Sequence, residues 1–481
     1  MALSNTLNID FSNSRNYDAE LITIKDVRAF DNQARKHSPE QIKKIATSIE
    51  TFGFLIPILI DEDNKVICGH GRIKALEFLG QDKVWAIRAN HLSEDQKRAY
   101  VLADNRLAEL GEWDEDALEI EIKHLLDADL DFEIGVIGFE TAEIDLIIAR
   151  SETSESTNQD PPVPEIEEHV VSETGDLWQL GTHRLYCGDA LASTSYAALM
   201  QNEQAHMVFT DPPYNVPIHN HVCGKGDIKH REFIMASGEM NDDEFCEFLR
   251  TFLILVYEHV IDGSVLNVCM DWRHLEHLLS SGRQAGLELI NLCIWNKDNG
   301  GMGSLYRSKH EDVVIFRKGS RTRTNNVMLG KFGRNRTNVW DYAGINTMRA
   351  GRLDELAMHP TVKPVALVKD AIFDVTHRDE IILDPFCGSG TTILSAEQSG
   401  RRCYAMELDP AYIDVAIRRY QDQFGIEVVH AETGMTFSQM QQHRHRPPIR
   451  NRTRDVYAAT DVGASAIGTP PARFAAPIVE G

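Results

Sequence analysis

Residues 381–392 read Ile-Ile-Leu-Asp-Pro-Phe-Cys-Gly-Ser-Gly-Thr-Thr. The apolar start predicts a short buried strand, and a helical pattern from Ile393 to Ser399 follows the glycines at once. Glycines at such a turn let a ligand approach the backbone and leave amide groups pointing at it. A phosphate-binding loop is the obvious rival, but no Lys precedes Thr391, so that pattern fails. The stretch therefore predicts an open α/β sheet with a ligand at the carboxyl ends of its strands.

The strand expected after this helix, Arg402 to Met406, ends in Glu407. An acid at the end of the second strand can hold ribose hydroxyls. Strands and helices alternate from Leu177 to about Phe424, so we expect an α/β domain over residues 173–432 with a mostly parallel sheet. Further strands are expected at residues 184–187, 207–209, 264–269, 287–295 and 313–316. Further helices are expected at residues 242–258 and 272–279.

A second informative stretch is Thr210-Asp211-Pro212-Pro213-Tyr214-Asn215, which follows the apolar run Met207 to Phe209. An exocyclic amino nitrogen of a nucleobase is a poor nucleophile, because its lone pair is delocalised into the ring. The carboxylate of Asp211 and the backbone carbonyl of Pro212 can accept its hydrogens and concentrate the lone pair on an electrophile. Tyr214 offers a flat face on which a base can stack. The alternative is a strand followed by a Pro-Pro turn that happens to carry Asp and Tyr.

Length and composition describe an ordinary multidomain protein. The 481 residues are 42% hydrophobic and 25% charged, and no apolar run approaches the roughly 18 residues that span a bilayer. The amino terminus lacks the pattern of a signal peptide, so we expect a cytoplasmic protein without a membrane segment. The eight cysteines form no C-x-x-C pair, which favours reduced thiols. His219, His221 and Cys223 are the nearest approach to a ligand cluster, but we expect a loop over the site there and no metal.

The net charge of −24 is unevenly distributed along the chain. Residues 297–352 hold twelve Lys and Arg against four Asp and Glu, whereas the acidic excess lies mainly in residues 109–173. Charge acts by patch more than by total, so the basic stretch is a candidate surface for nucleic acid. A solvated basic face is the alternative.

The first 150 residues predict a small α/β domain with a helical extension. Ser38 is expected to begin a helix with Pro39 at its first position and Gln41 completing a capping box. Gly69-His70-Gly71-Arg72 leads into a helix from Ile73 to Leu79, a turn that can bind an anion. Strands are expected at 57–60, 65–68 and 84–89, and residues 112–148 read as helical.

Two stretches predict little structure of their own. Residues 151–172 are rich in Ser, Thr, Pro and Glu and are expected to form a linker. Residues 433–481 include the basic run from His443 to Arg454 and end in a part rich in Ala, Gly and Pro. We expect residues 433–481 to form a flexible basic tail.

The first domain resembles the ParB-like amino-terminal domain, a fold shared with sulfiredoxin, over about 110 residues. The best-matching box is Cys68 to Ala75. His70, Gly71 and Arg72 stand where the segregation proteins have Glu-Arg-Arg, and the catalytic cysteine of sulfiredoxin has no counterpart after Gly69. Arg72 is therefore the one residue of this box that we match to a functional residue of the family. The resemblance implies DNA contact or assembly for this domain.

The pair of motifs in the second domain closely resembles the DNA amino-methyltransferases that use S-adenosylmethionine, which have a Rossmann-like fold. The motif order, catalytic strand first and cofactor loop last, is that of their beta group, and His359-Pro360-Thr361-Val362-Lys363-Pro364 matches the family's HPTxKP box. The resemblance implies that Asp211, Pro212, Pro213 and Tyr214 hold the target amino group. It assigns the cofactor to Asp384, Phe386, Gly388, Gly390, Thr391, Glu407, Asp189, His359 and Lys363.

The resemblance also implies the reaction and the partners. DPPY in place of SPPY favours the N6 of adenine in double-stranded DNA, with residues 297–352 as the target-recognition region. Beta-group enzymes are often dimers, so a homodimer is expected. Two alternatives stay open: the same chemistry on the N4 of cytosine or on RNA, and a non-catalytic ParB-like regulator. Intact Asp211 and Tyr214 speak against the second alternative.

Overall fold

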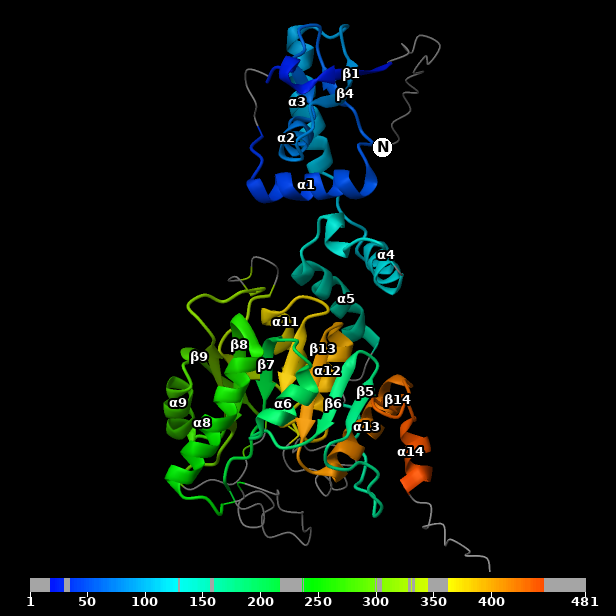
Figure 1. The fold of residues 1–481 in the computed structure, drawn as a ribbon. Coiled ribbons are helices and arrows are strands. Elements are labelled where there is room, and N and C mark those ends of the chain that lie inside the picture. The colour runs from blue at the N-terminus through cyan, green and yellow to red at the C-terminus, as the bar shows by residue number, and fades with distance from the viewer. Residues whose placement is uncertain are drawn as a thin grey trace, which may run out of the picture.

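The computed structural model describes residues 18–29, 35–128, 130–155, 160–216, 236, 238–298, 300, 305–327, 330, 334–344 and 362–444. Two α/β parts make up this structure, a four-stranded sheet near the amino terminus and a ten-stranded sheet after it. Figure 1 places the two sheets apart, with helices α4 (Glu115–Asp127) and α5 (Thr141–Glu155) between them. The predicted order of a small α/β domain followed by a larger one is thus found.

The first sheet has the order β1-β4-β2-β3, formed by strands Ala19–Thr23, Lys83–Arg88, Ile58–Ile60 and Val66–Cys68. Three helices accompany it: α1 (Pro39–Phe52), α2 (His70–Phe78) and α3 (Glu94–Glu109). Ile58, Val84 and Ala86 are buried at its centre. Strand β1 was not anticipated, because its exposed edge position leaves no buried apolar run in the sequence.

The ends of α1 and α2 differ in detail from the prediction. Ser38 accepts the backbone N–H of Gln41, as expected, but the Gln41 side chain contacts His37 at 3.1 Å and so does not complete a capping box. Helix α2 begins at His70, because Gly69 at φ 106° reverses the chain immediately after β3. A Cβ at Gly69 would lie 2.7 Å from Ile58, so this turn requires glycine.

The stretch predicted as a linker is ordered where it is described. The backbone N–H groups of Val171 and Ser172 donate to the carboxylate of Asp414 at 2.6 and 3.0 Å. The carboxylate of Asp160 accepts the N–H of Val365 at 3.1 Å. The expectation of a linker with little structure of its own is therefore wrong for residues 160–172, because these distant hydrogen bonds and the buried side chain of Val171 hold the stretch against the large domain.

The large sheet has the order β11-β9-β10-β8-β7-β12-β13-β6-β5-β14 (Figure 1). Strands β10 and β5 run against their neighbours, and the others share one direction, so the predicted mostly parallel sheet is confirmed. In sequence order the strands are β5 (Leu177–Leu180), β6 (His183–Cys187), β7 (Ala205–Thr210), β8 (Val260–Met270), β9 (Glu288–Asn296), β10 (His310–Arg317), β11 (Val339–Asp341), β12 (Ile381–Asp384), β13 (Arg402–Glu407) and β14 (Val428–His430).

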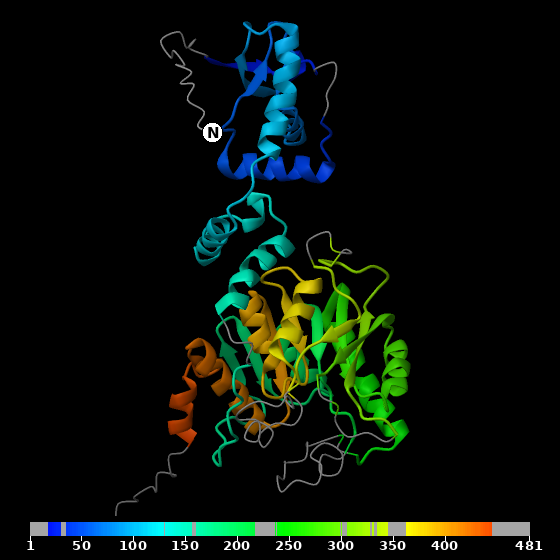
Figure 2. The same cartoon turned by 180° about the vertical axis from the view of Figure 1, so that it is seen from behind.

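Helices cover both faces of this sheet, as the view from behind also shows (Figure 2). One face packs against α6 (Ser193–Met200), α8 (Asp242–His259) and α9 (Leu275–Gln284). The other packs against α11 (Val365–Val375), α12 (Thr391–Ser399) and α13 (Pro410–Phe424). Helix α9 begins later than predicted, because the side chain of Asp271 accepts the N–H of Arg273 and holds a turn before it.

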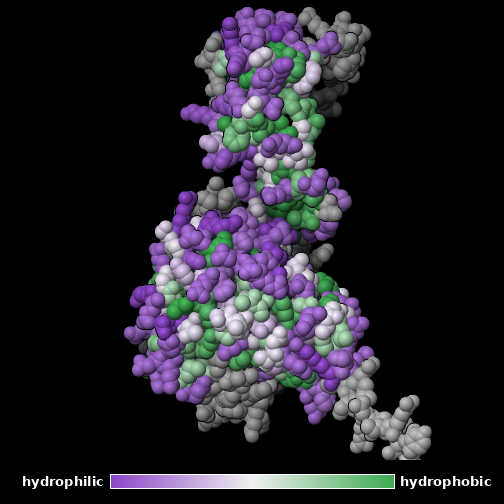
Figure 3. All heavy atoms as spheres, in the orientation of Figure 1, coloured by the Kyte–Doolittle hydropathy of each residue, from purple (hydrophilic) through white to green (hydrophobic). Residues whose placement is uncertain are grey.

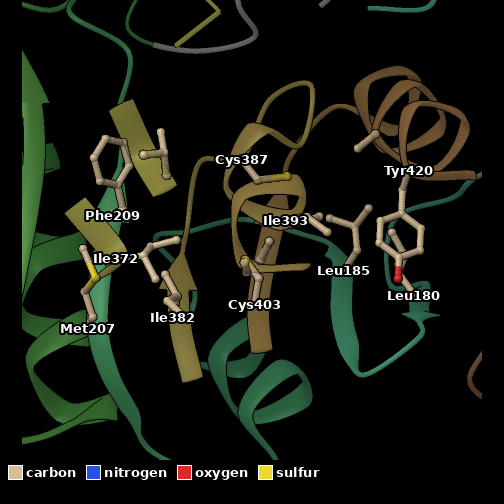
Figure 4. Packing of buried hydrophobic residues seen from close by; sticks show 14 of the residues in the cluster. Leu180, Leu185, Met207, Phe209, Ile372, Ile382, Cys387, Ile393, Cys403 and Tyr420 are labelled. Atoms are coloured by element: carbon tan, nitrogen blue, oxygen red, sulfur yellow. The ribbon is translucent and has the colours of Figure 1, made fainter. Parts of the chain in front are cut away.

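Buried strands at the centre of the sheet send side chains alternately to its two faces. Met207 and Phe209 of β7 pack beside Ile382 of β12 under α11 and α12 (Figure 4). Val208, between the first two, belongs to the cluster on the opposite face. Because both faces are buried, these strands read as continuous apolar runs in the sequence.

The predicted tail begins later than expected. Helix α14 (Phe437–Arg444) packs through Phe437 and Met440, and Arg444 pairs with Asp176 at 2.6 Å. Residues 433–444 are therefore part of the domain, and the two buried apolar residues of α14, three positions apart, cover one side of this short helix. The rest of the predicted tail lies outside the described residues.

No helix within the described parts of the chain is long and apolar enough to cross a membrane. The surface on the side of Figure 3 is mostly hydrophilic, with hydrophobic residues gathered around α4. Exposed apolar side chains near this helix include Leu107, Leu110, Trp113 and Ile120.

Candidate active site

The two motifs meet where β7 and β12 end side by side. These strands are parallel neighbours, with Val208 opposite Leu383, so Thr210 and Asp384 stand at the same edge of the sheet. The hydroxyl of Thr210 donates to Asp384 Oδ1 at 2.9 Å, and the hydroxyl of Thr392 donates to Oδ2 at 2.6 Å. Asp384 thus joins the end of β7 to the predicted cofactor loop.

Asp384 is almost completely buried, and the hydroxyls of Thr210 and Thr392 solvate its carboxyl group. Burial raises the pKa of Asp384 to about 7, although these hydrogen bonds act against the shift. The Phe386 N–H also donates to it, at 3.2 Å. Phe386 itself packs against Phe248 and Phe252 of α8, which fixes the first part of the loop.

The loop glycines have different surroundings. Gly390 has φ 83° and is the residue before α12, and a Cβ there would lie 2.9 Å from the Cβ of Ala416. Gly388 has φ 50°, but a Cβ there would meet no atom within 4 Å. The absence of a side chain at Gly390 therefore permits α12 and α13 to approach each other closely, whereas Gly388 faces open space. Thr391 begins α12 and accepts a hydrogen bond from Arg419 at 3.0 Å.

Glu407 stands at the end of β13, the next strand along the sheet. Its carboxylate accepts the N–H of Gly388 and that of Asp409, both at 3.0 Å, and burial raises the pKa of Glu407. The following strand, β6, leads to Asp189, whose carboxylate accepts the N–H of Leu191 at 2.8 Å. The structure therefore brings Asp384, Glu407 and Asp189 to one edge of the sheet, as predicted from the strand ends.

The Asp-Pro-Pro-Tyr motif folds back on itself at this edge. The Tyr214 hydroxyl donates to Asp211 Oδ1 at 2.5 Å, Pro212 is buried and Pro213 half-buried. Asn215 has φ 54° and accepts the N–H groups of Gly238 and Met240, which anchors the end of the motif. Burial raises the pKa of Asp211, and the ammonium group of Lys363 opposes that shift.

Lys363 lies against the Asp-Pro-Pro-Tyr motif. Its ammonium group contacts Asp211 Oδ2, lies 3.3 Å from the hydroxyl of Tyr214 and lies 3.1 Å from Glu311. Burial alone would lower the pKa of Lys363, but the carboxylates of Asp211 and Glu311 raise it. His359, the other residue taken from the same box, lies outside the described residues, as do His219, His221 and Cys223.

Sequence reasoning missed two charged residues of the site, Glu311 and Lys297. Glu311 lies at the start of β10 and Lys297 directly follows β9, and the two side chains form an ion pair. Burial favours the neutral acid, but Lys363 and Lys297 together lower the pKa of Glu311 to about 2. The sequence holds no signal for Glu311, because its place depends on β10 running antiparallel to β8.

Many cations of the basic stretch are paired within the molecule. Arg317 pairs with Glu288, Arg323 with Glu380, and Arg334 and Arg336 both with Asp374. Lys309 and Tyr306 are exposed. The formal charge of residues 297–352 therefore overstates the positive charge that the described part offers to a ligand. Among those residues for which the structure gives positions, no group of three or more His, Cys, Asp or Glu could hold a metal ion.

Residues 205–418, which span both motifs, match the family model described as DNA methylase. The chain carries a DNA methylase domain. Residues 10–106 match the ParB N-terminal domain, and residues 116–174 match the ParB-methyltransferase HTH domain. The HTH model spans α4, α5 and the stretch predicted as a linker, so the helical extension is matched as a domain of its own.

Relatives match the DNA methylase domain and the ParB-like domain separately. The type II methyltransferase M.HpaI of Haemophilus parainfluenzae is 23% identical over 255 residues, covering 50% of this chain and 75% of the relative. The DNA adenine methyltransferase YhdJ of Escherichia coli K12 is 25% identical over 257 residues, covering 48% and 80%. The ParB-like nuclease domain-containing protein YnaK of the same strain is 39% identical over 75 residues, covering 16% and 86%.

Proposed function

We propose that this chain transfers the methyl group of S-adenosylmethionine to the N6 amino group of adenine in double-stranded DNA. The observation that carries the proposal is the hydrogen bond from Thr210 to Asp384. It joins a motif suited to an amino acceptor to a glycine loop suited to a nucleoside cofactor. The DNA methylase domain and the similarity to an adenine methyltransferase support the same conclusion.

The residues at this edge fit such a cofactor. Gly388 leaves open space beside the loop, because no atom lies within 4 Å of the position where a Cβ would stand. The carboxylate of Glu407 accepts the backbone N–H groups of Gly388 and Asp409, and since its two oxygens have about four lone pairs it can also accept from a ribose hydroxyl. Asp384, Phe386, Gly388, Gly390 and Thr391 would hold the methionine part, and Asp189 the adenine side. S-adenosylmethionine supplies a methyl group already activated as a sulfonium, so alignment matters more than acid-base power.

Asp211 and Tyr214 act on the acceptor. An amino group that donates to Asp211 and to the carbonyl of Pro212 directs its lone pair out of the ring system toward the incoming methyl group. The amino nitrogen must lose one proton during the transfer, and burial makes Asp211 a stronger proton acceptor than an exposed aspartate. Tyr214, held through its hydroxyl, provides the stacking face for the base.

A base within a duplex cannot reach this buried motif, so the target must be flipped out at a cost of a few kcal/mol. We call residues 297–352 the recognition stretch. Its exposed side chains, including Lys309 and Tyr306, are available to hold the surrounding DNA. The ParB-like and HTH domains offer additional DNA contacts. A homodimer stays a prediction, and we assign no residue to its interface.

The test is incubation of the purified chain with DNA and isotope-labelled S-adenosylmethionine, followed by mass spectrometry of the digested nucleosides. We expect label in N6-methyladenine. Label in N4-methylcytosine would assign the reaction to cytosine, and no label across DNA of varied sequence would overturn the proposal. Asp211→Ala should abolish incorporation and still bind the cofactor, because Asp211 lies outside the glycine loop.

A further inference from the structure

We infer that Glu311, held in place by Lys297, is a positioning residue that receives the ammonium group of Lys363 when the target amino group binds to Asp211. The inference rests on the proposed function and deepens it. It concerns a step that any amino acceptor requires. The ammonium group of Lys363, which contacts Asp211 in this structure, must first move away from that carboxylate.

Lys363 makes the contacts that a target amino group would make. Its nitrogen donates to Asp211 Oδ2 and lies 5.7 Å from the centre of the Tyr214 ring. Only 6% of its side chain is exposed. An amino group cannot use the same carboxylate oxygen and the same space beside the ring while Lys363 remains there. The lysine therefore acts as a stand-in for the substrate nitrogen, and it must move when the base enters.

A buried ammonium group that loses its partner carries a large desolvation cost. Glu311 removes this cost, because its Oε2 atom already lies 3.1 Å from the Lys363 nitrogen. That oxygen is buried, and among the described residues Lys363 is the partner that the structure gives it. A small movement of Lys363 toward Glu311 would exchange one carboxylate for the other without exposing the charge to an apolar environment.

Lys297 keeps Glu311 in position. It pairs with the other carboxylate oxygen of Glu311, and its ammonium group lies 4.4 Å from the centre of the Trp295 ring. Backbone pairing fixes both residues, since Glu311 stands opposite Trp295 in the β9–β10 ladder and the Lys297 N–H donates to the carbonyl of Lys309 at 2.9 Å. Charges thus alternate along Asp211, Lys363, Glu311 and Lys297, so the set is balanced overall, with Lys363 buried and the other three half-buried.

The first experiment measures thermal unfolding midpoints and does not depend on activity. Glu311→Gln should lower the midpoint of the wild-type chain, because it removes one partner of Lys363. In a Lys363→Met background the same change should lower the midpoint by a smaller amount, because Glu311 then pairs with Lys297 alone and the repulsion between the carboxylates of Asp211 and Glu311 disappears. A lowering of equal size in both backgrounds would overturn the inference.

The second experiment measures kcat and the Kd for S-adenosylmethionine. Glu311→Gln should lower kcat tenfold or more with little change in Kd, and Lys297→Met should act in the same direction by a smaller factor, with Lys297→Arg restoring activity. The matched control is Glu288→Gln, which removes the ion pair with Arg317 at the other end of the same two strands. It should keep kcat within twofold.

These results separate the inference from the function on which it rests. A wild-type chain that transfers no methyl group to DNA would refute the proposed function, and the unfolding midpoints would still test the link between Glu311 and Lys363. An active wild type whose Glu311→Gln variant keeps kcat within twofold would refute the inference alone.

Discussion

Arg401 donates two hydrogen bonds to the carboxylate of Asp145, at 2.9 and 2.7 Å, and both side chains are buried. Asp145 belongs to α5, within the stretch matched by the HTH model, whereas Arg401 stands before β13 of the methylase domain. Arg401 also donates to the backbone carbonyls of Ser399 and Thr376. The buried carboxylate of Asp145, which pairs with Arg401 and, at 3.4 Å, with Arg378, therefore fixes the last helix before the methylase domain onto that domain.

Replacing Arg401 by Met should lower the free energy of unfolding by about 3–5 kcal/mol, because it removes the main partner of the buried carboxylate of Asp145 and leaves only the longer contact with Arg378, at 3.4 Å. Replacing both residues by apolar ones, as in Asp145→Leu with Arg401→Met, should recover part of the loss. Arg250→Met is the control, since Arg250 pairs with Glu247 on the exposed side of α8, where a pair contributes about 0–1 kcal/mol. Denaturant titration monitored by circular dichroism measures all three, and equal losses for Arg401→Met and Arg250→Met would contradict the expectation.

Alanine substitutions at the two loop glycines should have different main consequences, on stability at Gly390 and on cofactor binding at Gly388. Gly390→Ala places a Cβ 2.9 Å from that of Ala416, so we expect a loss of about 1–3 kcal/mol from overpacking in addition to the left-handed backbone cost of about 1–2 kcal/mol. Gly388→Ala carries the backbone cost alone, but its methyl group enters the space proposed for the cofactor.

Unfolding midpoints and calorimetric titration with S-adenosylmethionine separate these effects. Gly390→Ala should have the lower midpoint of the two. Gly388→Ala should show the larger loss of affinity relative to its change in stability. Unchanged affinity in Gly388→Ala would contradict the placement of the cofactor beside that residue.

Asp384 makes the stability of the chain depend on pH. Burial raises its pKa from 3.8 to about 7 in the folded chain, so between these values the folded state holds a proton that the unfolded state has released. Its contribution to stability therefore falls as the pH rises through this window, by at most about 1.4 kcal/mol per unit, and is constant above it. Asp384→Asn removes this dependence.

The check is to measure unfolding free energies of both proteins from pH 5 to pH 8. The stability of Asp384→Asn relative to the wild type should increase with pH across the range and level off near its upper end. Curves that stay parallel would mean that Asp384 is already ionised at the lower end.

Strand ends around the site were predictable because the central strands are buried on both faces. Their apolar runs stop at the polar residues Thr210, Asp384 and Glu407, and β7, β12 and β13 lie where the sequence indicates, within one or two residues. Since the carboxyl ends of parallel strands share an edge, the meeting of Asp211 with Asp384 follows from the fold class. The shared edge alone was enough to predict that Asp384 and Glu407 lie on the same side of the sheet, without knowledge of the strand order.

Contacts that depend on strand direction or on docked helices were not predictable. Glu311 reaches the site because β10 is antiparallel, and a short run of charged and apolar residues does not reveal that direction. Asp145 lies in an acidic helix, where a carboxylate reads as solvated, yet it is buried against Arg401. Lys363 was assigned to the cofactor by resemblance, and its contact with Asp211 follows from geometry alone.

Lys309 provides a direct test of DNA binding by the recognition stretch. Its side chain is exposed beside β10, whereas the ammonium group of Lys318 donates to the carbonyls of Tyr257 and Val260 at 2.8 Å. If Lys309 contacts a phosphate, Lys309→Ala should weaken binding to duplex DNA at low salt. It should also reduce the slope of log K against log salt concentration by about 0.9.

The control is Lys318→Ala. It should leave this slope unchanged and lower the unfolding midpoint, because the Lys318 ammonium group already donates to two backbone carbonyls within the protein. Fluorescence anisotropy titrations at several salt concentrations distinguish the two variants, and identical slopes for Lys309→Ala and the wild type would place the phosphate contacts elsewhere.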